Sequence, residues 1–212
     1  METLSAESNV QLMIDAVCRG DIAEVNALLH ASPTLATVTV RSKSPLHAVC
    51  FADHLAEETR VALINHLVST GADVNKGSRD NITPLFYAAR FGQLETIKTL
   101  VAHGARWDVS GGLYSWNTPT IESIDAGQLD VLKLRQSMLP LRAWKEPDVK
   151  YAIKIAISNR NIDMVRIFLD SEPTLDINHV ETPSLDGGTF LTIAIDHGAE
   201  DIVELLLVRG QM

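Results

Sequence analysis

The stretch NITPLFYAARFGQLETIKTLVAHGA, residues 81–105, decides the fold. Its first apolar run, residues 85–90, follows Thr83 and Pro84. A hydroxyl residue before a proline marks a helix start, because the hydroxyl can accept from a free backbone N–H and proline fits the first turn. Gly92 stands where a helix would end. This half of the stretch therefore predicts a short helix closed by a glycine.

The second half of the stretch predicts another helix. Its apolar residues recur at the spacing that places them on one helix face; they are Leu94, Ile97, Leu100 and Val101. Gly104 follows as the stop. The whole stretch is therefore a helix–turn–helix unit with a glycine at the end of each helix.

The same unit recurs along the chain. Aligned on the residue equivalent to Ala88, the copies fall at Ala16, Val49, Ala88, Ser123, Ala156 and Ala194, in steps of 33, 39, 35, 33 and 38 residues. A period near 33 with two helices per copy indicates a repeat array, in which each repeat buries one face against its neighbours.

The repeats resemble ankyrin repeats. TPLFYAARFGQLETIKTLVAHGARWD (83–108) is similar to the family pattern TPLHxAAxxGHxEIVKLLLxxGADVN, and SPLHAVC (44–50) and TGADVN (70–75) supply further matched pieces. The resemblance covers about residues 8–212 and implies an all-α solenoid of helix–turn–helix units with protruding fingers. It implies one domain over 1–212, with repeats at about 8–40, 41–75, 76–109, 110–147, 148–182 and 183–212.

Composition narrows the class of partner. The net charge of −9 argues against nucleic-acid binding, which rewards basic surfaces. No apolar run reaches the ~18 residues of a membrane span, and the first residues lack a signal-peptide pattern. Two cysteines, Cys18 and Cys50, suit a reducing compartment, so we expect a cytoplasmic or nuclear protein. Residues 133–160 hold seven Lys/Arg against two acids, which indicates either a patch for an acidic partner or a solvated face.

Two departures from the repeat pattern lie in the first half of the chain. FADHLAEETR (51–60) lengthens the second repeat and predicts either a longer first helix or a tolerated surface loop. The finger ARWDVSGGLYSWNTP (105–119) carries Trp107, Tyr114 and Trp116 around a Gly-Gly turn signal. Aromatic residues on a projecting finger indicate binding anchors, although some of them could instead fold back onto the helices.

Two further departures lie in the second half. Repeat four lacks a finger, and Leu139, Leu141 and Trp144 either plug the groove or present a contact, before a new helix start at Pro147. Residues 171–189 lengthen the next finger, with an acidic composition typical of a solvated loop.

No catalytic, metal-binding or cofactor motif is found in the sequence. His47 holds the place of the family's TPLH histidine, which implies a structural role. The resemblance implies that another protein binds the concave face and finger tips. The residues expected to bind it are Arg41, Phe51, Arg90, Phe91, Trp107, Tyr114, Trp116, Asp125, Ser158, Asp196 and His197.

An alternative hypothesis belongs to another class, namely a small-molecule pocket or an unconventional enzyme built on the repeats. It would centre on Tyr114, Trp116 and Asp125, with Glu122 on the same helix face as Asp125. A deep cavity lined by aromatic and carboxylate groups would favour this alternative, whereas an open groove would favour protein binding.

The last repeat lacks a polar outer face. IVELLLVRGQM (202–212) has the composition of an internal repeat, so part of its apolar set is expected to form an exposed strip. A homodimer through this helix, a partner docking there, or a longer natural chain would each explain it.

Overall fold

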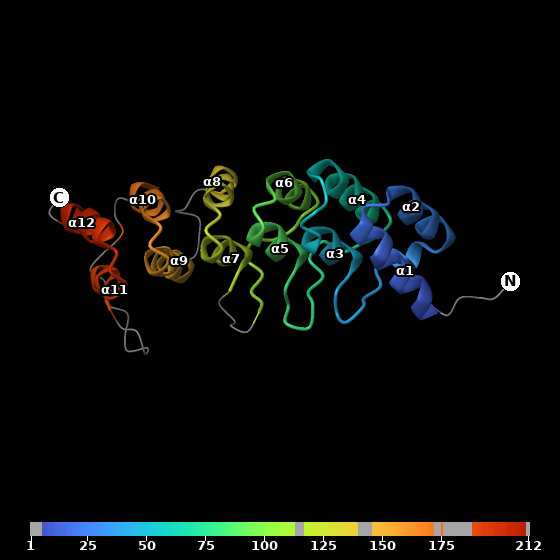
Figure 1. Ribbon diagram of the computed structural model, residues 1–212, viewed down its shortest axis with the longest axis horizontal. Coiled ribbons are helices and arrows are strands. Elements are labelled where there is room, and N and C mark those ends of the chain that lie inside the picture. The colour runs from blue at the N-terminus through green and yellow to red at the C-terminus, as the bar shows by residue number, and fades with distance from the viewer. Residues whose placement is uncertain (1–5, 113–116, 140–145, 172–174, 176–187, 211–212) are drawn as a thin grey trace. The chain divides into compact units, whose positions relative to one another are not determined.

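The computed structural model describes residues 6–112, 117–139, 146–171, 175 and 188–210 (Figure 1). Its contacts divide the chain into two compact units, residues 1–119 and 120–212, and each unit is described by itself. Every regular element in the described ranges is helical, which confirms the all-α prediction. Unit 1 contains α1 (Ala6–Arg19), α2 (Ile22–Ala31), η1 (Pro33–Ala36), α3 (Pro45–Phe51), α4 (Glu57–Ser69), α5 (Pro84–Arg90) and α6 (Leu94–Ala102).

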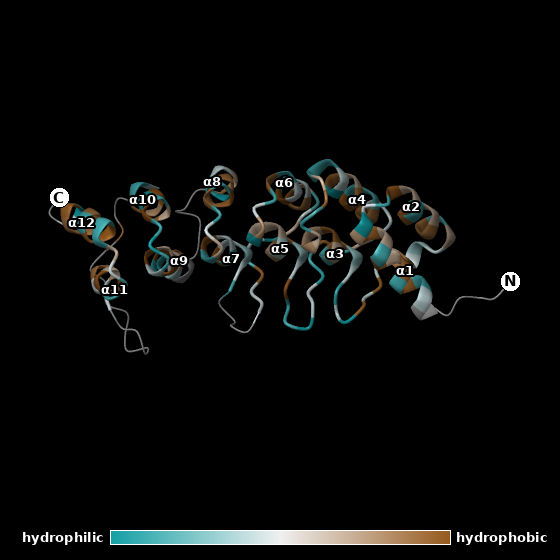
Figure 2. Ribbon diagram, in the orientation of Figure 1, coloured by the Kyte–Doolittle hydropathy of each residue, from teal (hydrophilic) through white to brown (hydrophobic). Residues whose placement is uncertain are grey.

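The helices of unit 2 continue the same alternation of a first and a second helix. They are α7 (Pro119–Asp125), whose first residue closes unit 1, α8 (Leu129–Met138), α9 (Glu146–Ser158), α10 (Ile162–Ser171), α11 (Phe190–Asp196) and α12 (Glu200–Arg209). Figure 2 shows hydrophobic and hydrophilic residues on the same helices, and helices such as α6 and α10 bury one hydrophobic stripe.

The predicted repeat register is confirmed. The six residues aligned on Ala88 are all fully buried, with 0% of their surface exposed; they are Ala16, Val49, Ala88, Ser123, Ala156 and Ala194. Ser123 is the only polar member of this set, and its hydroxyl donates to the carbonyl of Thr120 at 2.7 Å. This position therefore belongs to the core in every repeat, and at Ser123 the helix itself provides the acceptor that the buried hydroxyl needs.

The starts of α3 and α5 follow the predicted proline signal, but the caps differ. Pro45 and Pro84 are the first residues of their helices. The hydroxyl of Thr83 makes no cap hydrogen bond and is buried without a partner, so the expected side-chain cap is wrong there. α3 has a different contact at its start, in which Nδ1 of His47 accepts from the backbone N–H of the N-cap residue Ser44 at 3.0 Å.

In five of the six repeats the turn after the first helix has a left-handed backbone, whereas in the second repeat α3 is followed by Ala52, whose φ is −74°. Gly92 and its counterparts Gly20, Gly127 and Gly198 all have positive φ, between 62° and 73°. The fifth repeat places Arg160 at this point with a φ of 54°. A residue with a Cβ is strained in this conformation, so Arg160 carries a cost of about 1 kcal/mol that its glycine counterparts avoid.

The fingers of unit 1 are the connections at residues 37–44, 72–83 and 103–118, of which residues 113–116 lie outside the described part. In the first finger Val40 and Lys43 pair in a two-residue hairpin, through hydrogen bonds of 2.9 Å in both directions. The first two fingers project on the same side of the helices, below α3 and α5 in Figure 1.

The second and third fingers are joined to each other through their backbones. The N–H of Gly112 donates to the carbonyl of Asp80 at 2.7 Å, and the side chain of Asn81 donates to the carbonyl of Ser110 at 2.7 Å. Gly111 is buried at this junction. The second and third fingers are therefore held against each other rather than forming independent loops.

The insertion in the second repeat is an ordered loop, which settles the alternative between a loop and a longer helix. The loop, residues 52–56, lies between α3 and α4. The buried Arg60 donates from Nη2 to the carbonyls of Ala52 and Asp53, at 2.9 and 2.8 Å. His54 Nε2 donates to the carbonyl of Cys18 at 2.7 Å. The inserted residues thus strengthen the junction between repeats one and two.

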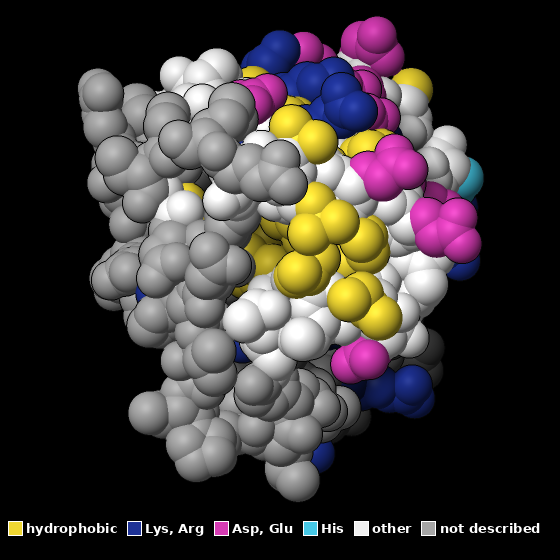
Figure 3. All heavy atoms as spheres, turned by 90° about the vertical axis from the view of Figure 1, so that its left-hand side faces the viewer, with side chains coloured by type: hydrophobic (Ala, Val, Ile, Leu, Met, Phe, Trp, Pro, Cys, Tyr) yellow, Lys and Arg dark blue, Asp and Glu magenta, His cyan; other side chains and the backbone are white. Residues whose placement is uncertain are grey.

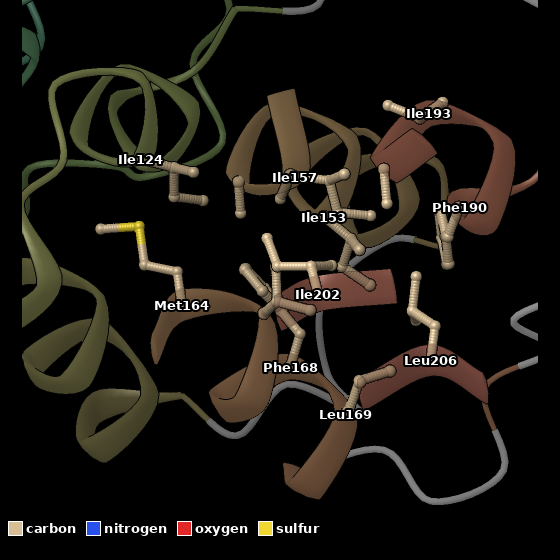
Figure 4. Close-up of a cluster of buried hydrophobic side chains, with 14 of the residues drawn as sticks. Ile124, Ile153, Ile157, Met164, Phe168, Leu169, Phe190, Ile193, Ile202 and Leu206 are labelled. Carbon is tan, nitrogen blue, oxygen red and sulfur yellow. The ribbon is translucent and has the colours of Figure 1, made fainter. Parts of the chain in front are cut away.

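Unit 2 has a continuous core between its first and second helices. Figure 4 shows side chains of α7, α9, α10, α11 and α12 in this core, with Phe168 of α10 close to Ile202 of α12. The large core residues are less than 10% exposed; they include Ile124, Ile153, Ile157, Met164, Phe168, Leu169, Phe190, Ile193, Ile202 and Leu206. Pro147 is the second residue of α9, close to the predicted helix start. Leu141 and Trp144 lie outside the described residues, as do most of residues 172–187.

Candidate functional site: an aromatic–lysine cluster on unit 1

The candidate site lies on the surface of unit 1 that is carried by α3, α5 and the fingers before them, called here the inner-helix surface. Two residues that the sequence predicts to bind a partner are the most exposed aromatic residues of this surface. Phe51 is the last residue of α3 and is 53% exposed, and Phe91 directly follows α5 and is 38% exposed. Large apolar side chains are normally covered, so two of them in contact with each other on one surface indicate a binding site.

A third aromatic residue, Tyr87, joins the two phenylalanines. The rings of Phe51 and Tyr87 meet edge to face, with centroids 5.4 Å apart, and the rings of Phe51 and Phe91 do the same at 6.1 Å. Both distances lie in the range where aromatic pairs attract. The three rings therefore form one contiguous group that spans repeats two and three.

The ammonium group of Lys43 completes the group. Its Nζ lies 4.6 Å from the ring centroid of Phe51 and 5.2 Å from that of Tyr87. These distances are typical of cation–π contacts. We call Lys43, Phe51, Tyr87 and Phe91 the aromatic–lysine cluster.

His47 supports the cluster from within the protein. Its ring is buried and meets Tyr87 edge to face at 6.3 Å. Because Nδ1 accepts from Ser44, the proton is on Nε2, which donates to the carbonyl of Ile82 at 2.8 Å. Burial lowers the pKa of His47, and the nearby charge of Lys43 lowers it further, although the hydrogen bond to Ile82 opposes both effects. The neutral ring therefore links α3 to the second finger, which confirms its predicted structural role.

The other predicted residues of unit 1 have different positions. Arg41 is exposed at the tip of the first finger, and Arg90 is exposed at the end of α5. Trp107 is buried, with 9% of its surface exposed, so it lies in the core and not on the surface expected for a binding anchor. It follows the alternative in which the finger aromatic folds back. Tyr114 and Trp116 lie outside the described residues.

In unit 2, the residues predicted to bind a partner lie at or next to the end of a first helix. Asp125, Ser158 and Asp196 are the last residues of α7, α9 and α11, just as Phe51 and Arg90 end α3 and α5. Asp125 and Asp196 are exposed and Ser158 is half-buried. His197, also exposed, donates from Nδ1 to the carbonyl of Ile193 at 2.9 Å.

Sequence reasoning missed Tyr87 and Lys43. Tyr87 precedes the fully buried Ala88, so the repeat register alone does not distinguish a surface ring from a core ring. Lys43 is eight residues from Phe51 in the sequence, and the finger hairpin and one short helix bring the two together. The sequence did contain a signal for the cluster. A lysine stands just before SPLHAVC, and aromatic residues stand at the ends of two consecutive first helices.

The end of unit 2 carries the other apolar surface. Figure 3 looks onto this end, where hydrophobic side chains gather beside acidic ones. Leu207 and Val208 of α12 are 48% and 63% exposed, and Ile195 of α11 is 58% exposed. Ile202 and Leu206 are buried, so part of the apolar set of α12 is covered and the remainder is exposed, as expected.

Other kinds of site find no support in the described residues. Among them, no three His, Cys, Asp or Glu side chains are grouped as metal ligands. None of the described helices combines the length and apolarity that crossing a bilayer requires. The alternative pocket depends on Tyr114 and Trp116, so the described residues do not assemble it.

The fold and sequence were compared with known proteins. The crystal structure of the human ASB11 ankyrin repeat domain is similar, with a TM-score of 0.70 and 21% sequence identity over 93% of this chain and 83% of that chain. This likeness concerns the fold. A family model described as "Ankyrin repeats (3 copies)" matches residues 12–111, 54–136 and 123–211. Ankyrin repeats are generally protein-interaction modules. With nearly the whole sequence covered by these matches, the chain belongs to the ankyrin-repeat family.

Proposed function

We propose that this chain binds another protein through the inner-helix surface of unit 1, with the aromatic–lysine cluster at the centre of the contact. The observation that carries the proposal is the exposure of Phe51 and Phe91 side by side, at 53% and 38%. The repeat family supports it, because its members generally act in protein interaction.

The cluster has the composition of an interface centre. Aromatic residues dominate binding hot spots, where truncation of a well-buried one costs about 2–4 kcal/mol. The edge-to-face packing of the three rings limits their rotation before a partner arrives. A surface that is already ordered loses less conformational entropy on binding, so more of the contact energy appears as affinity.

The surroundings of the cluster suit an interface rim. Arg41 and Arg90 are exposed on the same surface, and arginine is enriched in interfaces. On unit 2, Asp125, Ser158, Asp196 and His197 belong to the proposal as a further contact region, since they hold the helix-end places that Phe51, Arg90 and Phe91 hold on unit 1.

We place this interaction in a reducing intracellular compartment. Cys18 is half-buried and Cys50 is buried, and both are free thiols. Burial raises the pKa of both thiols, so they stay protonated and unreactive. Two unpaired, inert cysteines suit a compartment that does not form disulfides.

Affinity capture with matched variants tests the proposed function. The full chain, its Phe51→Ala/Phe91→Ala double variant and a Met138→Ala control would each be used to capture proteins from cell extract. Met138 is as exposed as Phe91, at 38%, but belongs to α8 of unit 2. The double variant should lose a protein that the wild type and the control both retain, with an affinity decrease of about 2 kcal/mol or more.

The folding of each variant is checked by its circular dichroism melting curve. Because both phenylalanines are partly exposed, their loss should lower the stability by less than that of a core residue. An unchanged set of captured proteins, with all three chains folded, would exclude the cluster as the binding centre.

A further inference from the structure

We propose that the segment recognised by the aromatic–lysine cluster is an acidic–apolar peptide segment of the partner. In this arrangement a bulky apolar side chain packs on Phe51 and Phe91, and a neighbouring Asp or Glu carboxylate pairs with the ammonium of Lys43. The inference rests on the proposed function and adds the chemistry of the partner to it.

The first two fingers carry a net positive charge, whereas unit 1 as a whole carries a net negative charge. Residues 1–119 hold nine Lys/Arg against twelve Asp/Glu. The first two fingers, residues 37–44 and 72–83, hold four Lys/Arg against two Asp. Positive charge is therefore concentrated on the two fingers that precede the helices of the cluster, on an otherwise acidic unit, and such a distribution attracts an acidic partner and repels a basic one.

Lys43 has hydrogen-bonding capacity to spare. An ammonium group has three donors, and the two ring faces can occupy only part of them. Among the described residues, Lys43 and Arg41 take part in no ion pair with a carboxylate. A carboxylate of the partner would meet a cation that is already positioned and partly desolvated by the rings, where charge pairing is stronger than in water.

Two acids near Phe51 in the sequence, Asp53 and Glu57, do not pair with Lys43. The carboxylate of Asp53, two residues after Phe51, lies 3.7 Å from the ring of His54. The carboxylate of Glu57 accepts from the hydroxyl of Thr96 at 2.6 Å. No acid of the α3–α4 connection therefore forms a described ion pair with Lys43, and the cation stays available to a partner.

The finger that carries Lys43 is held in an unfavourable backbone conformation. Arg41 and Ser42 are the two central residues of its hairpin, and both have positive φ, 48° and 68°. Glycine or asparagine suits this turn type much better. Backbone strain of this kind is found at functional sites, and here it belongs to the hairpin that directs Lys43 towards the rings and sets Arg41 beside it.

The competing occupant is a basic segment whose own cation would lie on the ring faces. Lys43 already occupies the faces of Phe51 and Tyr87. An incoming cation would have to displace it and would also face the repulsion of Arg41. The structure therefore favours the acidic segment.

Selection from a random-peptide display library on the full chain tests the inference. The peptides selected by the wild type should be enriched in Asp or Glu next to a bulky apolar residue. Phe51→Ala should weaken their binding about tenfold or more, which is the scale of an interface anchor. Lys43→Met should weaken it several-fold and reduce its dependence on salt concentration.

Two controls separate the charge contact from loss of folding. Lys98→Met removes a lysine of α6 that pairs with Glu95 and lies away from the cluster, so it should leave peptide affinity unchanged. Replacing the carboxylates of a selected peptide by amides, with the protein unaltered, should reproduce the loss seen with Lys43→Met.

The outcomes distinguish the two proposals. Peptides that depend on Phe51 but are basic or uncharged, or that bind Lys43→Met as well as the wild type, would overturn the inference and leave the proposed function standing. If no selected peptide depends on Phe51 or Phe91, the proposed function of the cluster is overturned, and the inference with it.

Discussion

Replacing Gly111 with alanine should separate the second and third fingers of unit 1. A Cβ added at this buried glycine would lie 2.7 Å from the carbonyl carbon of Asn81 and 3.0 Å from the carbonyl oxygen of Asp80. Carbon atoms in ordinary contact are about 3.5–4.0 Å apart, so the backbone of the second finger would have to retreat by roughly an ångström. Because both contacts are with backbone, no side-chain rotation can relieve them.

The retreat would break the hydrogen bonds that join the fingers. Those are the bonds from Gly112 N–H to Asp80 and from Asn81 to Ser110, both 2.7 Å long. Each hydrogen bond contributes about 0.5–1.5 kcal/mol to the free energy of unfolding. Alanine offsets about 0.4–1 kcal/mol of this loss, because it restricts the unfolded chain more than glycine does. The expected net loss of stability is about 1–2 kcal/mol. Disturbed spacing between the fingers should also weaken partner binding.

Urea denaturation of the full chain, with hydrogen exchange of the Gly112 amide, measures the effect. Ser110→Ala is the matched control, since its side chain is exposed and alanine keeps the Cβ that serine already has. The reasoning is wrong if Gly111→Ala has the same denaturation midpoint as Ser110→Ala and its Gly112 amide exchanges as slowly as in the wild type.

Three other predictions concern a strained turn, a buried ring and an apolar end. Arg160→Gly should raise stability by about 0.5–1 kcal/mol in thermal unfolding, because it removes a Cβ at a φ of 54°, whereas Arg160→Ala keeps the strain and should not. Because burial lowers the pKa of His47, the unfolded chain binds a proton more readily than the folded chain. The contribution of His47 to the free energy of unfolding should therefore be fully present above about pH 6.5 and should fall below that pH, by up to about 1.4 kcal/mol per pH unit. A His47→Gln variant should lack this pH dependence. A homodimer through α12 is one of three explanations for the exposed apolar strip, and Leu207, 48% exposed, tests it. If the dimer forms, Leu207→Lys should shift it to monomer in sedimentation velocity at micromolar concentration, and a wild type that is monomeric throughout would exclude the dimer.

The repeat register could be predicted from the sequence because one physical constraint repeats. The reference position of every first helix is fully buried, so the residue there must be small or apolar. The same holds for the left-handed turn, where glycine is the residue that fits best. The buried reference position recurs in all six repeats, and the left-handed turn recurs in five, because the insertion of the second repeat replaces its turn. This recurrence makes both features predictable from the sequence.

The candidate site was only half predictable. Phe51 and Phe91 were found because helix-end positions face outward in each repeat. Lys43 and Tyr87 were missed, since their roles depend on the direction of side chains after a hairpin and a helix have formed. Trp107 shows the opposite error, because a finger aromatic close to a helix end can cover the core, and its burial depends on packing that residue spacing does not encode.

The hydrogen bonds between repeats have a consequence for the speed of folding. In unit 1 they run from His47 to Ile82, from His54 to Cys18, from Gln93 to Cys50 and from Asn75 to Gly104, over 35, 36, 43 and 29 residues. None of these separations grows with the length of the array, because each bond reaches only the adjacent repeat. The loop that must close before any junction forms is therefore about one repeat long, wherever it lies in the unit. Such a chain has low contact order for its size, so it should fold quickly from whichever pair of repeats meets first and extend outward one junction at a time.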